Sequence, residues 1–230
     1  MIALLRYQTA NLFRSHRWIM PLIVFALLIS VGGAGSGEQA GSGQEAAHLR
    51  ALGLVSGLDW SAAIVLVVTA LLTRLMLTAE PGAARACAAA ARGPGRAQLA
   101  TLLTAFAGGA VLGLAGACYE VVTVGRHTAL LAPVLDGLGK ALVCAFVGSA
   151  VGTLFNAPVI RHQAVALLST IAAVVVALVS SVSPANAAMH GNGAAIQSAA
   201  WPTGVPMAAA FALVVLSWTV SCWLAGRRSD

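Results

Sequence analysis

The sequence predicts an all-α fold, a polytopic membrane protein in which residues 1–230 form a single transmembrane domain with six membrane-spanning helices. Only 9% of the residues are charged and 59% are hydrophobic, whereas a soluble domain usually carries about 25% charged residues. The hydrophobic residues also gather in continuous runs, without the alternation that a membrane barrel requires. A chain with so few charges cannot cover a surface in contact with water, so we expect its solvent to be lipid.

Six apolar runs, each long enough to cross roughly 30 Å of hydrocarbon as a helix, follow one another along the chain. They cover about residues 18–33, 58–77, 98–122, 133–155, 163–182 and 205–225. The first run has an alternative interpretation, because its basic lead-in and the small residues after Gly32 are also typical of a cleavable signal peptide. Cleavage would leave five spans. The 17 residues that precede the run favour a helix that is retained.

The positions of the cations orient these helices. Ten of them lie in the N-terminal segment, in the loops after the second and fourth runs, and in the C-terminal tail; the other three loops hold only Arg50 and Arg126. The same three loops are assigned the acidic residues Glu38, Glu45, Asp59, Glu120 and Asp136. Because Lys and Arg are in excess on the cytoplasmic side, we expect both termini in the cytoplasm and the protein in the plasma membrane.

Two segments outside the runs are expected to lie at the membrane surface or to enter it. In residues 1–16, apolar side chains share one helical face while Arg6 and Arg14 face water, which favours a helix lying in the interface over an irregular basic leader. The last outer loop, residues 183–203, carries no charge. This composition favours short re-entrant helices buried against protein, the alternative being an ordinary loop of small residues.

The loop between the second and third runs is predicted to carry a cytoplasmic helix over residues 79–93. Pro81 suits a first helical position, an acidic residue before it complements the positive helix end, and Gly93-Pro94 ends the helix. The charged residues of this segment are Glu80, Arg85 and Arg92. Its many alanines would let a partner approach closely. A simple connector is the alternative.

Glycine spacing gives a weak indication of how the helices pack. Gly109 and Gly113 in the third run, and Gly148 and Gly152 in the fourth, are each four residues apart. Such pairs lie on one helical face and let two backbones approach closely in a membrane.

Motifs for catalysis are missing from the sequence. It contains no HExxH, no GxSxG and no GxxxxGK[ST] phosphate loop, and the four cysteines are too scattered for a zinc site or a disulfide framework. We therefore expect neither enzyme activity nor a cofactor in this chain. Nucleic-acid binding is also disfavoured, despite a net charge of +6, because the cations lie between apolar runs.

Lys140 is the only lysine of the sequence, and it lies within the fourth run. An ionisable residue inside lipid is a functional candidate by default. Asp136 precedes it by four residues in the favourable acid-before-base order, so we favour a local ion pair with the amine extended to the interface. Glu120, at the outer end of the third run, is interpreted in the same way, as an interfacial acid in preference to a proton carrier. No intramembrane carboxylate is expected.

Taken as a whole, the chain resembles the transmembrane subunit of an ATP-binding-cassette (ABC) exporter of the type-2 permease class, in its compact actinobacterial form. The resemblance covers essentially all 230 residues. It rests on the N-terminal amphipathic segment, on the stretch from Thr78 to Arg85 with its alanine run, on the stretch from Gly148 to Arg161, and on the long neutral outer loop.

The resemblance implies a dimer of two permease subunits, each seated on a separate ATPase subunit that binds ATP and Mg. Residues 79–93 would be the coupling helix, and residues 1–16 the elbow helix. The residues implied in contact with the ATPase are Glu80, Pro81, Arg85 and Arg92. The translocation cavity would be lined mainly by the second and fifth spans, with the last outer loop as its gate. The few polar groups in the spans favour a hydrophobic or amphipathic cargo.

Two other classes of function stay open. A secondary transporter or channel would be expected to show intramembrane carboxylates or an inverted repeat with broken helices. A non-transport membrane scaffold or immunity protein would have the same sequence pattern as a permease. Co-purification of a separate ATPase chain would distinguish a permease from both.

Overall fold

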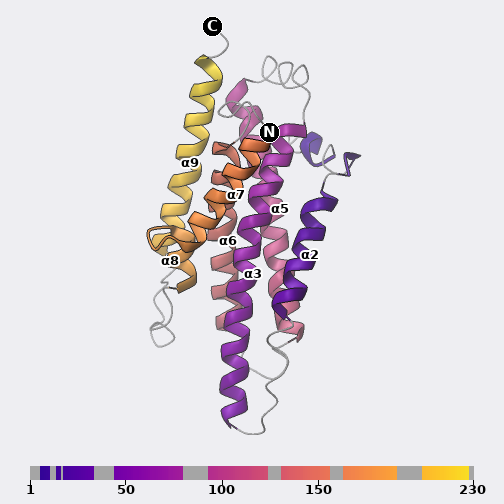
Figure 1. Ribbon diagram of the computed structural model, residues 1–230, viewed down its shortest axis with the longest axis vertical. Coiled ribbons are helices and arrows are strands. Elements are labelled where there is room, and N and C mark those ends of the chain that lie inside the picture. Colours follow the sequence, from indigo (N-terminus) through magenta and orange to yellow (C-terminus); the bar gives the residue numbers. More distant parts are fainter. Residues whose placement is uncertain are drawn as a thin grey trace.

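The computed structural model describes residues 6–10, 14–16, 18–33, 44–79, 93–123, 131–155, 163–190 and 204–227. Within these ranges the regular structure is helical and no strand occurs, so the predicted all-α class is confirmed. The helices are α2 (Ile19–Gly33), α3 (Gln44–Ala79), α5 (Pro94–Thr123), α6 (Leu131–Leu154), α7 (Gln163–Val179), α8 (Pro184–His190) and α9 (Gly204–Arg227). They form an elongated bundle with α3 near its centre (Figure 1).

Four helices are long and apolar enough to cross a membrane. Their apolar parts are Leu52–Thr78 in α3, Gln98–Thr123 in α5, Ala132–Leu154 in α6 and Gly204–Trp223 in α9. The helices at the first and fifth predicted runs, α2 and α7, are apolar but have 15 and 17 residues. At about 1.5 Å per residue they fall short of the roughly 30 Å of a hydrocarbon core. The four long helices indicate a membrane-embedded protein.

Two of the long helices extend beyond the runs that predicted them. The second run was expected to start at residue 58, but α3 begins at Gln44, because a helix continues into water where apolarity ends. Asp59 and Arg74, which were assigned to the loops on either side of this run, lie inside the apolar part of α3. The third run starts earlier too, since Pro94 occupies the first position of α5 and Gly93 before it has a φ of 85°.

Along the chain, α2, α3, α5, α6, α7 and α9 alternate in direction, so the start of α2 and the end of α9 lie at the same end of the bundle (Figure 1). The C-terminal end of α3 and the N-terminal end of α5 lie at this end as well. We call it the terminal end, and the other the far end. The far end holds the start of α3, the last turn of α5 and the first turn of α6.

The closest backbone approach joins α3 to α6, the pair with the most extensive packing. A Cβ atom added to Gly148 would lie 2.5 Å from the carbonyl oxygen of Leu66, and one added to Gly152 would lie 2.7 Å from that of Ala70. The glycine pair predicted in the fourth run therefore does bring two backbones together. On the neighbouring side of α3, Phe25 and Ile29 of α2 join a second apolar cluster.

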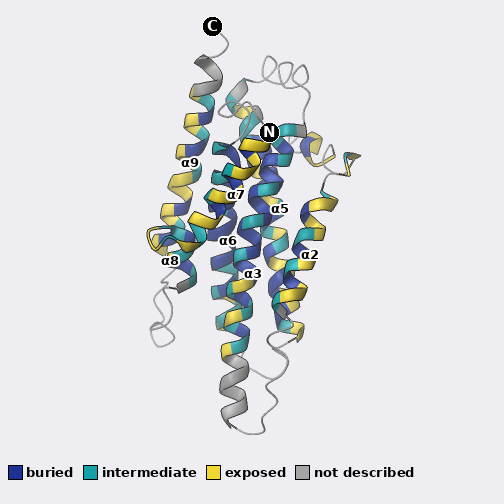
Figure 2. Cartoon of the chain, viewed as in Figure 1, coloured by how far each residue is buried: buried dark blue, intermediate teal, exposed yellow. Residues whose placement is uncertain are grey.

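Large apolar side chains cover the outside of the bundle as well as filling its core. The outward faces of α2, α7 and α9 expose large apolar side chains, whereas α3 and α6 are mostly buried (Figure 2). Buried hydroxyl groups donate to carbonyls one turn earlier in their own helices: Thr104 to Ala100 at 2.8 Å, and Thr170 to Ala166 at 2.7 Å. In lipid, polar groups must find their hydrogen-bond partners within the protein. Apolar side chains on the outside and hydrogen-bonded hydroxyl groups inside are therefore stable in a membrane.

Candidate functional site

Three charged side chains meet between α3 and α6, in the half of α6 nearer the far end. The Nζ atom of Lys140 donates to Oδ1 of Asp59 on α3 at 2.6 Å. It also lies 3.2 Å from Oδ2 of Asp136, one turn earlier on α6. The lysine side chain is only 2% exposed, and the two acidic side chains are 29% and 33% exposed. We call Asp59, Asp136 and Lys140 the ion cluster.

The ion cluster differs from the expected local pair in two ways. The amine of Lys140 does not extend to the interface; it is buried and directed toward α3. Its shorter bond goes to Asp59, which is 81 residues away in sequence and had been assigned to an outer loop. Spacing along one helix can predict the Asp136 contact, but it carries no information about which residue a neighbouring helix presents. The available signal was an acid within an otherwise apolar stretch.

The ion cluster can hold α3 and α6 together, and it can attract a proton or a small cation. Two carboxylates and one ammonium leave one formal negative charge in excess, so a proton or a small cation would be attracted there. A short charge-assisted hydrogen bond between α3 and α6 also fixes their register at this level. The described residues contain no group of three or more His, Cys, Asp or Glu side chains that could hold a metal ion.

A fourth ionisable group, Glu120, is buried one turn from the end of α5. Its side chain is among the largest that are fully buried, at 1% exposure, and it packs against Gly57 of α3. Neither carboxyl oxygen has a hydrogen-bond partner within the described part of the chain. Glu120 lies near the end of α5, as predicted for an interfacial acid, but its side chain is buried against α3. A carboxyl group is present inside the bundle because α3 extends past its apolar run and covers it.

At the opposite end of α3, Arg74 is also buried, with 8% of its surface exposed. The sequence assigned it to the cytoplasmic loop, but it lies in the apolar part of α3, just over one turn before the helix ends at Ala79. Its charge still belongs to the terminal end of the bundle. The bias of cations toward that end is therefore unchanged.

A corner between α7 and α8 occupies the start of the predicted re-entrant loop. Ser183 Oγ accepts a hydrogen bond from the backbone N–H of Ala185 at 3.3 Å, and Pro184 is the first residue of α8. Asn186 Nδ2 donates to the carbonyl oxygen of Leu178 at 2.6 Å, which satisfies the end of α7. The short helix packs against α6, α7 and α9. The rest of that loop, residues 191–203, lies outside the described residues.

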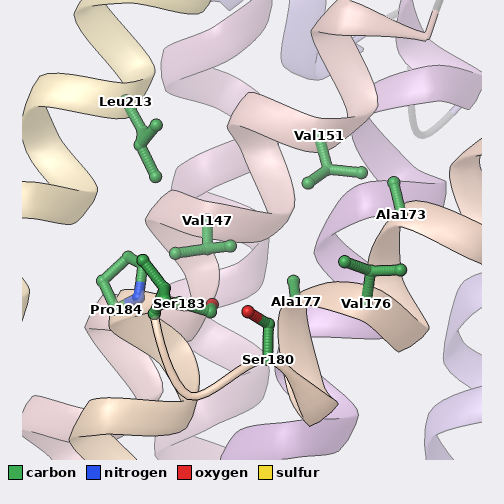
Figure 3. A pocket seen from close by; sticks show the side chains of 10 residues that line it. Val147, Val151, Ala173, Val176, Ala177, Ser180, Ser183, Pro184 and Leu213 are labelled. Atoms are coloured by element: carbon green, nitrogen blue, oxygen red, sulfur yellow. The ribbon is translucent and has the colours of Figure 1, made fainter.

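An open apolar recess of about 360 Å³ lies between α6, α7, α8 and α9. Figure 3 shows Val147 and Val151 of α6, Val176 of α7 and Leu213 of α9 around it. The hydroxyl groups at the α7–α8 corner supply its few polar atoms. The recess can accommodate an alkyl chain. α7, the helix of the fifth run, lines this recess, and α3 contributes none of the residues that line it.

Several predicted residues cannot be placed. Glu80, Pro81, Arg85 and Arg92, the residues expected to contact an ATPase, lie outside the described residues, as does most of the predicted coupling helix over 79–93. Of the predicted elbow segment, residues 6–10 are helical and residues 1–5 and 11–13 lie outside.

Comparisons with protein-family models, with curated proteins and with solved structures find no match to this chain. The similarity to ABC exporter permeases therefore rests on sequence features alone.

Proposed function

We propose that this chain is the membrane-spanning permease subunit of an ATP-driven ABC exporter in the plasma membrane. The observation that carries the proposal is the threading of the bundle. The start of α2, the end of α3, the start of α5 and the end of α9 lie at one end (Figure 1), and the arginines of the sequence are concentrated in the segments that precede, join or follow them there. By the excess of cations, this end is cytoplasmic. The loop between α3 and α5 thus begins and ends where an ATPase would dock.

In this proposal the chain makes six crossings. Four are the long apolar helices, and α2 and α7 make the other two. Both are apolar, and each runs opposite to the helix that follows it in the bundle, as a crossing must. α7 is too short to cross the hydrocarbon core by itself. The α7–α8 corner, which packs against α6 and α9 within the bundle, extends its path.

The packing of α3 supports a route for mechanical coupling. A force on residues 79–93 acts directly on the ends of α3 and α5. The close contact at Gly148 and Gly152 transmits movement of α3 to α6, and the ion cluster joins the same two helices nearer the far end. Two subunits would form the pathway, each on its own ATPase. The apolar recess supports a hydrophobic or amphipathic cargo.

Co-purification from membranes of the native host tests the proposal. The tagged chain is expected to bring down a separate ATPase chain with Walker motifs. The double variant R85E/R92E should lose most of it, because reversed charge would disrupt the docking segment. R227E, which makes the same kind of change in the C-terminal tail, is the matched control and should retain the ATPase. Recovery of the parent chain without any ATPase would contradict the proposal.

A secondary transporter is the second candidate, and the buried carboxyl of Glu120 together with the ion cluster favours it, since such carriers use intramembrane acids. Accumulation of a fluorescent hydrophobic dye in inside-out vesicles separates the two functions. An exporter with its ATPase requires ATP and continues to work when a protonophore collapses the proton gradient. Dye accumulation without ATP that the protonophore abolishes would favour the secondary transporter.

A further inference from the structure

The carboxyl group of Glu120 is a buried ionisable group that neither packing nor the ion cluster explains. It is 1% exposed and lies in the apolar part of α5, where we treat the chain as surrounded by lipid. Both oxygens lack a hydrogen-bond partner among the described residues. An ionised carboxylate so placed would be highly unfavourable, and such a group remains buried by binding a proton or by pairing with a cation.

The charged groups on the helices around α5 are already engaged with one another. α5 packs against α2, α3, α6 and α9. On α3 and α6, the ionisable residues of this half of the bundle whose side chains the structure describes are Asp59, Asp136 and Lys140, and Lys140 is bonded to the two acids. The first turns of α3 also carry Glu45, His48 and Arg50, whose side chains lie outside the description. The sequence of α2 and the apolar part of α9 contain no charged residue. Among the side chains that the structure describes, no cation therefore neutralises Glu120.

The space around Glu120 selects the smallest cation. A Cβ atom added to Gly57 would overlap Oε2 of Glu120 and lie 2.7 Å from its carboxyl carbon. The carboxyl group thus rests directly on the backbone of α3, and not even a methyl group fits between them. An organic cation is too large for this contact, whereas a proton needs no additional room.

We propose that Glu120 is a proton-binding site at the contact between α3 and α5. The carboxyl group is protonated while it rests against Gly57, and it releases its proton when the two helices separate at the far end. Exchange of this proton with water requires only a short path, because Glu120 is three residues from the end of α5 at Thr123. The contact between α3 and α5 is consequently a proton-dependent one, whether or not transport is driven by ATP.

Infrared difference spectroscopy of the full chain in lipid nanodiscs tests the protonation state directly. A protonated carboxyl has a C=O stretch that shifts in D₂O, and a carboxylate has symmetric and antisymmetric bands in its place. The spectrum of the parent minus that of E120Q should contain the protonated band at neutral pH. The spectrum of the parent minus that of D136N should contain carboxylate bands, because Asp136 is paired with Lys140. Carboxylate bands in the E120Q difference would overturn the proposal.

The dependence of folding stability on pH provides a second test of the proposal. A group that is protonated in the folded state and ionised in the unfolded state makes stability fall as pH rises. The melting temperature of the parent should therefore fall more steeply than that of E120Q between about pH 6 and about pH 9, since the neutral amide of E120Q mimics the protonated acid. Parallel profiles would count against the site.

The variant G57A keeps the test independent of substitutions at Glu120. Its added Cβ would occupy the position of the carboxyl oxygen and push the group out of its contact. We expect the protonated band to be lost at neutral pH and carboxylate bands to replace it. G204A is the matched control, because a Cβ at Gly204 has nothing within 4 Å. Retention of the band in G57A at parent intensity would show that the contact with Gly57 does not hold the proton.

Discussion

At the scale of single residues, Lys140 shows how a membrane protein accommodates a buried charge. Removing an ammonium group from water costs several kcal/mol, and the attraction of a partner offsets this only with good geometry. The contacts of 2.6 Å to Asp59 and 3.2 Å to Asp136 provide that geometry. Asp59 is on α3 and Asp136 is on α6, so the ammonium group of Lys140 can pair with both acids only when these two helices are packed together.

Removal of the ammonium group should therefore destabilise the bundle. We expect K140M to lower the free energy of unfolding by about 2–4 kcal/mol, because two partly buried carboxylates are left without their cation. D59N should be more harmful than D136N, since Asp59 makes the shorter bond. Unfolding in detergent, followed by tryptophan fluorescence, measures these changes.

The triple variant K140M/D59N/D136N is the control for this prediction. It removes the whole ion cluster and leaves no unpaired charge, so it should recover much of the stability lost in K140M. A triple variant no more stable than K140M would show that the loss in K140M comes from packing and not from charge.

At the scale of the helices, glycine decides how closely α3 and α6 approach. The atoms that face Gly148 and Gly152 are backbone atoms of α3, which cannot rotate away as a side chain can. Large apolar residues elsewhere on α6, such as Phe146, fill the gaps beside this contact, and Phe146 stacks on Phe106 of α5 with ring centroids 4.3 Å apart. Close backbone packing and aromatic stacking together place α6 in the middle of the bundle.

A single methyl group at this contact should force the helices apart. G148A would place a Cβ atom 2.5 Å from the carbonyl oxygen of Leu66. We expect a loss of about 1–3 kcal/mol in the free energy of unfolding, the usual cost of overpacking. G204A, which adds the same methyl group in open space, should leave the stability close to that of the parent. Equal stability of G148A and G204A would mean that α3 and α6 are not in contact there.

At the scale of the whole molecule, the even alternation of helix directions determines which segments share a side of the membrane. The start of α2, the end of α3, the start of α5 and the end of α9 lie together at the terminal end (Figure 1). The start of α3 and the end of α5 lie at the far end. A membrane around this bundle therefore separates residues 79–93 from the first outer loop.

A membrane-impermeant maleimide tests this threading with a native cysteine. A variant that retains Cys87 alone among the four cysteines should be labelled in inside-out vesicles and protected in intact cells. A second variant, with E38C as its only cysteine, should show the opposite pattern, because residue 38 lies in the first outer loop. Labelling of Cys87 in intact cells would reverse the orientation and remove the docking role of residues 79–93.

The sequence predicted the helices well and their ends less well. A run of apolar residues marks where lipid surrounds a helix, so all six predicted runs coincide with helices of the structure. A helix does not end where lipid ends, and for this reason α3 begins at Gln44, well before its predicted run. α7 ends at Val179, before the predicted residue 182, because the Ser183 cap and Pro184 start a new helix there.

The sequence by itself determined that this protein is helical and embedded in a membrane, because both follow from composition and from the length of apolar runs, which are local properties. It also determined that Asp136 and Lys140 share one face of a helix. Only the tertiary structure decided that Asp59 completes the ion cluster and that Glu120 rests on Gly57 with no partner among the described side chains. These contacts join residues far apart in the chain, and the packing of the helices, which no local pattern encodes, brings them together.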